Sequence, residues 1–237
     1  MPTEPEKLVD SPNPLAEIFY AHTGRQVNKW VHYLDIYHRH LEQFRGQPIT
    51  LVEFGVMHGG SLELWREYLG PQARIVGVDI NPECKKLEDE HTRIFIGDQA
   101  DRDFLTSIAD EIGPVDVLIE DGGHRPPQQL ATFQCLYPRM TENGVFIIED
   151  LHTSYWPGYR GGLRRKGTFM EFAKRKVDQL NAWHSREEGF EVNRFTRTTR
   201  SIHFYDSVCV FERGTVKRPR KHQVGDPSLS APPPYRR

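Results

Sequence analysis

Hydrophobic and polar positions follow two different periods along this chain. Short apolar runs rich in β-branched residues, each bounded by glycine, proline or a polar turn, predict five strands, at residues 49–54, 74–78, 93–96, 115–119 and 144–148. Between them, apolar residues at helical spacing predict helices at residues 61–69, 101–109 and 128–137. Ser61 and Asp101 are the expected N-caps of the first two. This alternation is typical of an α/β fold with a parallel sheet.

The two ends of the chain have a different pattern. Residues 15–44 repeat aromatic and aliphatic side chains at helical spacing, among them Trp30, Tyr33 and Tyr37, which predicts one or two helices before the first strand. Residues 201–205 and 207–211 alternate around Asp206 and predict an antiparallel hairpin. We therefore expect a Rossmann-like, doubly wound sheet of seven strands, mostly parallel and closed by a carboxy-terminal antiparallel hairpin.

The boundaries follow from these elements. A closing antiparallel hairpin is more typical of a methyltransferase fold than of a dehydrogenase fold, so we expect a single methyltransferase-like core at residues 49–212. The other segments are an irregular arm at 1–14, a helical segment at 15–48 and a basic, proline-rich tail at 213–237.

Charge changes this picture only at the tail. The chain has a formal net charge of -2 at pH 7, but from Arg213 onward it carries seven Lys or Arg and one acid, Asp226. The tail is thus +6 and the remainder -8, since these sum to the -2 of the whole chain. Such a charge run is usually solvated, and we expect no nucleic-acid partner.

Cysteine usage and hydropathy indicate the compartment. Cys84, Cys135 and Cys209 are an odd number without close spacing, which argues against disulfides and against a zinc cluster. The first residues are acidic and proline-rich, unlike a signal peptide, and no apolar run approaches the length of a membrane span. We expect a cytoplasmic protein without a membrane partner.

Acidic side chains gather where the last two parallel strands end. Asp121-Gly-Gly-His124 follows one strand and Glu149-Asp150 follows the next. Parallel strands lie about 4.8 Å apart, and ligands sit beyond their carboxyl ends. Three carboxylates this close repel one another unless a cation neutralises them. We therefore predict a metal site made by Asp121, Glu149 and Asp150, with His124 as a base beside it.

The earlier strand ends predict a cofactor site. The loop from Glu53 through Gly55 to Ser61 brings glycine close to a helix amino terminus, which favours binding of a carboxylate group. The loop lacks the complete G-x-G-x-x-G spacing that binds a pyrophosphate, and this disfavours a nicotinamide cofactor. Asp79 is placed to accept hydrogen bonds from ribose hydroxyls. Asp98 and Gln99 offer an acceptor and an amide to an adenine edge.

These motifs resemble S-adenosylmethionine binding in class I methyltransferases. Residues 23–37, the Glu53 loop, residues 97–99, Asp121-Gly-Gly-His124 and residues 149–156 together resemble the metal-dependent sugar O-methyltransferases of macrolide biosynthesis, over residues 20–211. The resemblance implies magnesium at Asp121, Glu149 and Asp150 and a general base at His124. It also implies a homo-oligomer. We expect a compact version without the extra amino-terminal domain of the macrolide enzymes.

The predicted reaction is methyl transfer from S-adenosylmethionine to a hydroxyl of a small secondary metabolite of sugar or polyketide type. Tyr155 and Trp156, just beyond the acidic pair, are candidates for the wall of the acceptor pocket. A carboxylate acceptor, giving a methyl ester, is the alternative. Nucleic-acid methylation is disfavoured because residues 121–124 replace the Asn/Asp-Pro-Pro-aromatic motif that base-modifying enzymes carry after the fourth strand.

Overall fold

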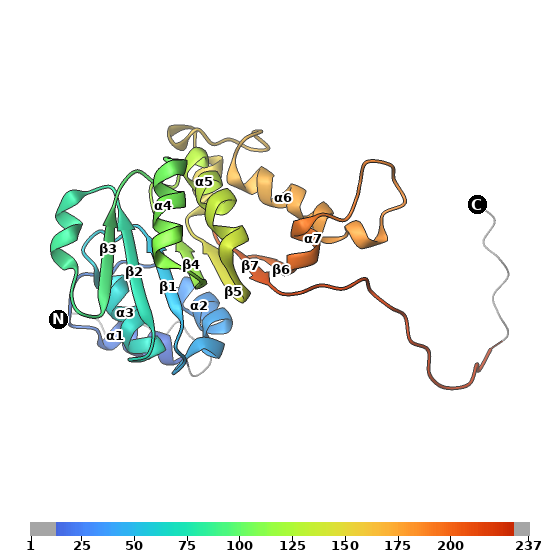
Figure 1. The fold of residues 1–237 in the computed structure, drawn as a ribbon, viewed down its shortest axis with the longest axis horizontal. Coiled ribbons are helices and arrows are strands. Elements are labelled where there is room, and N and C mark those ends of the chain that lie inside the picture. Colours follow the sequence, from blue (N-terminus) through green and yellow to red (C-terminus); the bar gives the residue numbers. More distant parts are fainter. Residues whose placement is uncertain (1–12, 230–237) are drawn as a thin grey trace, which may run out of the picture.

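The computed structural model describes residues 13–229, and within that range seven strands form one mixed sheet in the order β3-β2-β1-β4-β5-β7-β6 (Figure 1). Strands β1 to β5 are parallel, and β7 runs antiparallel between β5 and β6. The strands are β1 (Thr50–Phe54), β2 (Arg74–Asp79), β3 (Thr92–Ile96), β4 (Val115–Glu120), β5 (Met140–Ile148), β6 (Thr199–Phe204) and β7 (Cys209–Arg213). The predicted Rossmann-like fold is confirmed.

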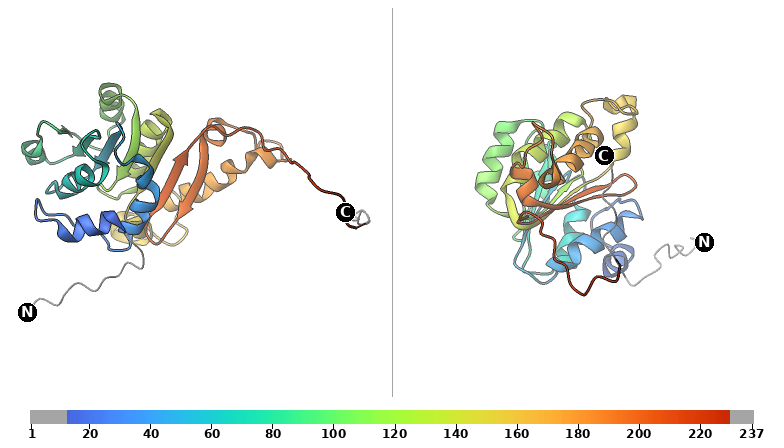
Figure 2. Two further views of the ribbon diagram at one scale, coloured as in Figure 1. Left: turned by 90° about the horizontal axis from the view of Figure 1, so that it is seen from below. Right: turned by 90° about the vertical axis from the view of Figure 1, so that its right-hand side faces the viewer.

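Helices cover both faces of this sheet. One face packs against α1 (Pro14–Ala21), α2 (Tyr33–Leu41) and α3 (Gly60–Leu69), and the other against α4 (Arg102–Ile112), α5 (Pro126–Leu136) and α6 (Phe169–Leu180). The short helix α7 (Arg194–Thr198) precedes β6. Short 3₁₀ segments lie at Glu42–Phe44, Pro82–Leu87, Tyr137–Arg139, Leu151–Tyr155, Pro157–Tyr159 and Ala182–His184. Residues 214–229 leave the sheet as an extended segment (Figures 1 and 2).

The two-residue period of the strands sorts the polar side chains between the two faces. In β1, Leu51 belongs to the core beneath α1 to α3, whereas Val52 and Phe54 belong to the core beneath α4 to α6. Because successive side chains of a strand point to opposite faces, Glu53 lies on the side of α1 to α3. The same alternation places Glu120 on the side of α5.

Several predicted boundaries were wrong. The hairpin cannot turn on Asp206 alone, because chain reversal needs at least two loop residues. Strand β6 ends at Phe204 and β7 begins at Cys209, with Ser207 in the left-handed region at φ 65°. Helix α3 begins at Gly60 and has Gly59 as its N-cap, so Ser61 lies inside the first turn and caps nothing.

The remaining differences lie outside the predicted strands. Residues 15–44 form two helices separated by a loop at 22–32, and Trp30 lies in that loop with 57% of its surface exposed. Helix α6 was not predicted. The expected arm at 1–14 and the end of the tail lie largely outside the described residues. The three cysteines are free thiols, and no helix between residues 13 and 229 is long and apolar enough to cross a membrane.

Candidate active site at the carboxyl edge of the sheet

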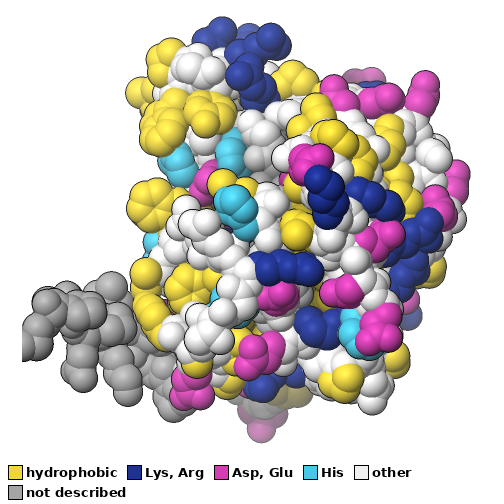
Figure 3. All heavy atoms as spheres, turned by 90° about the vertical axis from the view of Figure 1, so that its left-hand side faces the viewer, with side chains coloured by type: hydrophobic (Ala, Val, Ile, Leu, Met, Phe, Trp, Pro, Cys, Tyr) yellow, Lys and Arg dark blue, Asp and Glu magenta, His cyan; other side chains and the backbone are white. Residues whose placement is uncertain are grey.

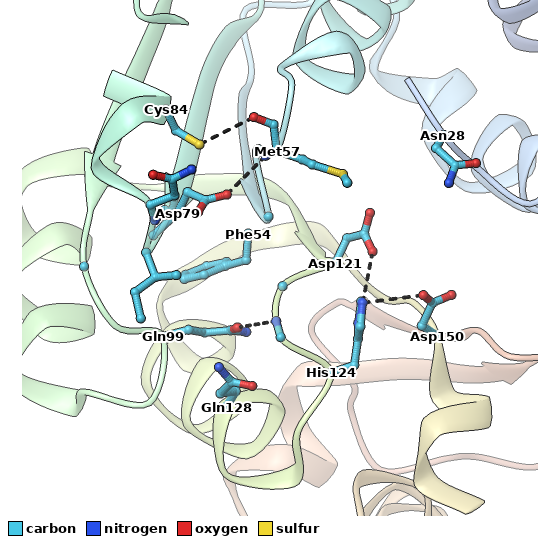
Figure 4. Close-up of a pocket in the computed structure, with 17 residues that line it drawn as sticks. Asn28, Phe54, Met57, Asp79, Cys84, Gln99, Asp121, His124, Gln128 and Asp150 are labelled. Atoms are coloured by element: carbon cyan, nitrogen blue, oxygen red, sulfur yellow. Dashed lines mark hydrogen bonds and ion pairs between the residues drawn. The ribbon is translucent and has the colours of Figure 1, made fainter. Parts of the chain in front are cut away.

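Two adjoining cavities open at the carboxyl ends of the parallel strands. The first, of about 530 Å³, extends from Asp79 and Gln99 to His124 and Asp150. The second, of about 380 Å³, is lined by the loop before α2 and shares Asn28, Asp121 and Asp150 with the first. Figure 4 shows the side chains around the first cavity. Two reactants bound side by side would therefore meet at Asp121 and Asp150.

Asp79 and Gly55 shape the first cavity. One oxygen of Asp79, Oδ2, accepts hydrogen bonds from the backbone N–H groups of Val56 (2.8 Å) and Met57 (3.1 Å), and so fixes the turn after β1. Gly55 has φ 93°, and a Cβ there would collide with the backbone carbonyl of Asp121. The turn can pass this close to Asp121 only because residue 55 is glycine.

Glu53 and Ser61 lie behind the cavity wall. The carboxyl group of Glu53 is fully buried and accepts a hydrogen bond of 2.6 Å from the Ser61 hydroxyl. Burial raises the pKa of Glu53 above its ordinary value. We predicted that these two residues touch the cofactor, but they line neither cavity. Their hydrogen bond instead supports the turn between β1 and α3.

Gln99 lines the first cavity, whereas Asp98 does not. The amide nitrogen of Gln99 donates to the buried carboxylate of Glu120 at 2.6 Å and to the Thr132 hydroxyl at 2.9 Å. Burial raises the pKa of Glu120 to about 7. Asp98 is exposed, and its carboxylate accepts from the backbone N–H of Ala100. Of the two predicted adenine contacts, Gln99 lines the cavity and Asp98 does not. The amide nitrogen of Gln99 is already hydrogen-bonded to Glu120 and Thr132.

Of the three predicted metal ligands, Asp121 and Glu149 meet at a lysine, whereas Asp150 does not contact it. The ammonium Nζ of Lys29 lies 2.5 Å from Oδ2 of Asp121 and 2.9 Å from both carboxylate oxygens of Glu149. Glu53 is 3.4 Å away. Burial, followed by repulsion from Asp121, raises the pKa of Glu149 well above its ordinary range. Burial alone would lower the pKa of Lys29, but the neighbouring acidic groups, led by Asp121 and Glu149, together outweigh burial and raise it.

Asp150 and His124 form the other half of the acidic site. Nε2 of His124 lies 3.5 Å from a carboxylate oxygen of Asp150 and 3.9 Å from one of Asp121 (Figure 4). The Tyr33 hydroxyl donates to the second oxygen of Asp150 at 2.8 Å. The imidazole therefore faces the two carboxylates at the point where the cavities join.

The arrangement fits a hard divalent cation. Ligand atoms of Asp121, His124 and Asp150 lie within 4.8 Å of one another, and so do those of Glu53, Asp121 and Glu149. The Lys29 ammonium shows that the oxygens of Asp121 and Glu149 converge on a position that holds positive charge. Carboxylate oxygens are the ligands that Mg²⁺ prefers.

A row of aromatic side chains begins at Trp30 in the lining of the second cavity. Trp30 lines that cavity and contacts His152 edge to face, with ring centroids 6.1 Å apart. His152 in turn packs on Trp156 at 4.5 Å. Trp156 is 50% exposed and Tyr155 42%, although neither is among the described residues that line the two cavities. Of the two predicted acceptor residues, Trp156 is the one linked to Trp30, through His152.

Lys29 and Tyr33 were not predicted as site residues. Both lie in the segment whose aromatic spacing indicated helix packing, and a single lysine there looks like a solvated charge. The one signal was indirect, since three carboxylates at neighbouring strand ends require positive charge and lysine can supply it as well as a metal can.

Comparison with known proteins agrees with this geometry. Residues 52–151 match the model of a family described as a methyltransferase domain. The 8-demethyl-8-alpha-L-rhamnosyl tetracenomycin-C 2'-O-methyltransferase of Streptomyces olivaceus is 35% identical over 198 residues, which cover 78% of this chain and 52% of that protein. Mycinamicin VI 2''-O-methyltransferase of Micromonospora griseorubida is 31% identical, over 75% of this chain and 47% of that protein.

A solved structure has the same fold and matches a similar part of this chain. The MycE methyltransferase of the mycinamycin biosynthetic pathway, in complex with Mg, SAH and mycinamycin VI, superposes with a TM-score of 0.77 and 28% identity. The match covers 87% of this chain and 54% of MycE. This chain therefore spans about half the length of the curated relatives that it matches.

Proposed function

We propose a function from one premise, that this chain belongs to the class I methyltransferases as a homologue of the macrolide and tetracenomycin sugar O-methyltransferases. The proposed reaction is transfer of a methyl group from S-adenosylmethionine to a sugar hydroxyl of a small secondary metabolite. The observation that carries the proposal is the junction of two cavities at Asp121 and Asp150, with the His124 imidazole beside it.

S-adenosylmethionine is proposed to bind in the first cavity. Asp79 keeps Oδ1 available beside its backbone contact with Asn81, and that oxygen can accept from the ribose hydroxyls. The methionine part is proposed to lie beside Gly55, which lines the cavity at the turn after β1. Gln99 lines the adenine end, while Glu53, Ser61 and Asp98 contribute by supporting the surrounding turns. MycE in complex with SAH supports this assignment.

Magnesium is proposed to bind to Asp121, Glu149 and Asp150. Asp121 supports the assignment because its carboxylate converges with Glu149 on one side and with Asp150 on the other. Mg in the MycE complex supports it as well. When bound, the ion would orient the acceptor oxygens and lower their pKa. The carboxylates supply the negative charge that holds such an ion at the junction of the cavities.

His124 is proposed to be the general base. Its Nε2 takes the proton of the acceptor hydroxyl while the hydroxyl oxygen bonds to the methyl carbon. The bond from that carbon to the sulfonium sulfur breaks, and S-adenosylhomocysteine leaves with the electron pair. The carboxylate of Asp150, 3.5 Å from Nε2, stabilises the imidazolium that forms. A positioned base of this kind contributes about 10²- to 10⁴-fold.

The acceptor is proposed to enter through the second cavity. Trp30 and Trp156, joined by His152, offer apolar faces on which a sugar ring can stack. Tyr155 lies next to this group and remains a proposed contact. Lysine, arginine and acidic side chains alternate over the face shown in Figure 3, which supports a small acceptor rather than a nucleic acid.

An acceptor screen tests the proposal. The chain, methyl-labelled S-adenosylmethionine and Mg²⁺ are incubated with deoxysugar glycosides and, separately, with aliphatic carboxylic acids, and products are identified by mass spectrometry. We expect methyl ethers on the glycosides, stable to mild alkali. Alkali-labile methyl esters formed only from the acids would support the carboxylate alternative and overturn the sugar proposal.

A further inference from the structure

Lys29 supplies a positive charge at the centre of the acidic site. Its side chain is only 3% exposed, and its ammonium contacts Asp121 and Glu149, with Glu53 slightly farther away. The carboxyl groups of Glu53 and Glu149 are themselves almost fully buried. Buried carboxylates without a partner are strongly destabilising, and the ammonium neutralises part of this cluster.

The loop that carries Lys29 is fixed to the methyltransferase core. The backbone N–H of Arg25 donates to the Glu63 carboxylate at 2.8 Å, and its guanidinium donates to the Leu87 carbonyl at 3.1 Å. The backbone of Arg25 and Gln26 passes so close to Gly60 that a Cβ there would collide with it. Lys29 therefore reaches the carboxylates from an anchored loop, and its position is not that of a freely moving surface lysine.

The oxygens that hold Lys29 are also those proposed for magnesium. Nζ contacts one oxygen of Asp121 and both oxygens of Glu149 at 2.5–2.9 Å. Two cations at hydrogen-bonding or coordination distance from the same oxygens repel each other in a poorly solvated site. A metal ion that uses Asp121 and Glu149 must therefore displace the ammonium from part of its contacts or bind against its charge.

We propose that Lys29 competes with the divalent cation for the carboxylates of Asp121 and Glu149. The inference rests on the proposed metal site. Lys29 keeps the acidic cluster stable when no metal is bound, and the same charge weakens metal binding. Asp150, which pairs with His124 and Tyr33, stays outside this competition.

The competition predicts opposite effects on two measured quantities. Removing the ammonium in Lys29→Met or Lys29→Gln leaves the carboxylates unpaired, so the melting temperature without divalent cations falls. The same change removes the repulsion felt by the metal, so the affinity for Mg²⁺ rises by about tenfold or more. Mg²⁺ also raises the melting temperature of each variant further than that of the wild-type chain.

The experiment is calorimetric titration with Mg²⁺ alone, together with thermal unfolding with and without Mg²⁺. Lys174→Gln is the matched control, because Lys174 forms an exposed ion pair with Glu171 on α6 and should leave Mg²⁺ affinity unchanged. Lys29→Gln serves if Lys29→Met fails to fold. Tighter binding by the Lys29 variants than by the wild-type chain is the expected result.

The contrary outcomes separate the two proposals. Measurable Mg²⁺ binding by the wild-type chain, with equal or weaker binding by both Lys29 variants, overturns the competition and leaves the metal site in place. It would indicate that Lys29 only positions the metal ligands. Lack of Mg²⁺ binding by all the chains overturns the proposed metal site and the competition together.

Discussion

His124 and Asp150 combine a strained backbone with side chains that face each other. Both have φ 52°, in the left-handed region that non-glycine residues rarely occupy. Such a conformation costs about 1–3 kcal/mol and persists where the surrounding structure requires it, which is often at functional sites. Here the strain accompanies the 3.5 Å approach of the imidazole to the carboxylate.

Replacing His124 with alanine tests the base. We expect His124→Ala to lower turnover by about 10²- to 10⁴-fold, because the acceptor proton then has no positioned base. Affinity for S-adenosylmethionine, measured by calorimetry, should change little. His91→Ala, which alters an exposed histidine, is the control. Turnover of His124→Ala at the wild-type rate would remove the base assignment.

A residue could be assigned to the site from the sequence when its position at the end of a strand determines where its side chain lies in the fold. Asp121, Glu149 and Asp150 could be placed at one edge of the sheet because each lies within two residues of the end of a parallel strand. Lys29 could not be predicted in this way. Its position depends on the path of a loop across α3, which is a tertiary contact without a local sequence signal.

The elements of the parallel sheet were predictable because buried strands give continuous apolar runs. The hairpin was misplaced because Ser201 to Phe211 alternates throughout, and the pattern does not show where the chain reverses. Helix α6 was not predicted, although Phe169, Phe172, Ala173 and Val177 recur at helical spacing and the pattern was therefore present in the sequence. The loop at 22–32 is the element on which the site depends most.

Gly60 allows the loop at 22–32 to pass close to the first turn of α3. In Gly60→Ala the new methyl group would meet the backbone of Arg25 and Gln26, so the loop must shift and move Lys29 with it. We expect a loss of about 1–3 kcal/mol in the free energy of unfolding, as for other overpacked contacts. Gly158→Ala is the control, since a Cβ there meets nothing within 4 Å. Equal stability of the two variants, measured by urea denaturation, would contradict this role.

Glu212 joins α2 to the closing hairpin. Its carboxylate accepts from Nδ1 of His40 at 2.8 Å and from the Ser201 hydroxyl at 2.7 Å. These contacts, His40 first, lower the pKa of Glu212 from 4.5 to about 2. Because the folded-state pKa is the lower one, the stabilisation is full above about pH 4.5 and is lost as the pH falls toward 2.

We therefore expect a pH-dependent effect of Glu212→Gln. The variant should be less stable than the wild-type chain at pH 7 by about 1–2 kcal/mol, a modest value because the group is partly solvated. The difference should narrow between pH 4.5 and pH 2, as measured by urea denaturation at a series of pH values. Glu191→Gln, at an exposed position, is the control. A difference that stays constant over this range would show that ionisation of Glu212 does not contribute.

The whole molecule places its two cavities on one edge of a single sheet. The sheet supplies Asp79, Asp121 and Glu149, while the loop before α2 closes over them with Lys29 and Trp30. Residues 214–229 extend away from this edge and take no part in the site (Figure 1). The homo-oligomer expected from the resemblance stays a prediction, which light scattering of the full chain can check.

Dependence of methyl transfer on a divalent cation tests the central claim most directly. The rate of methylation of a glycoside acceptor is measured with wild-type chain before chelation, after removal of divalent cations by EDTA and dialysis, and after addition of Mg²⁺. We predict that activity is lost on removal and restored by Mg²⁺, because Asp121, Glu149 and Asp150 then hold the cation against the acceptor oxygens. Full activity in excess chelator would contradict the account.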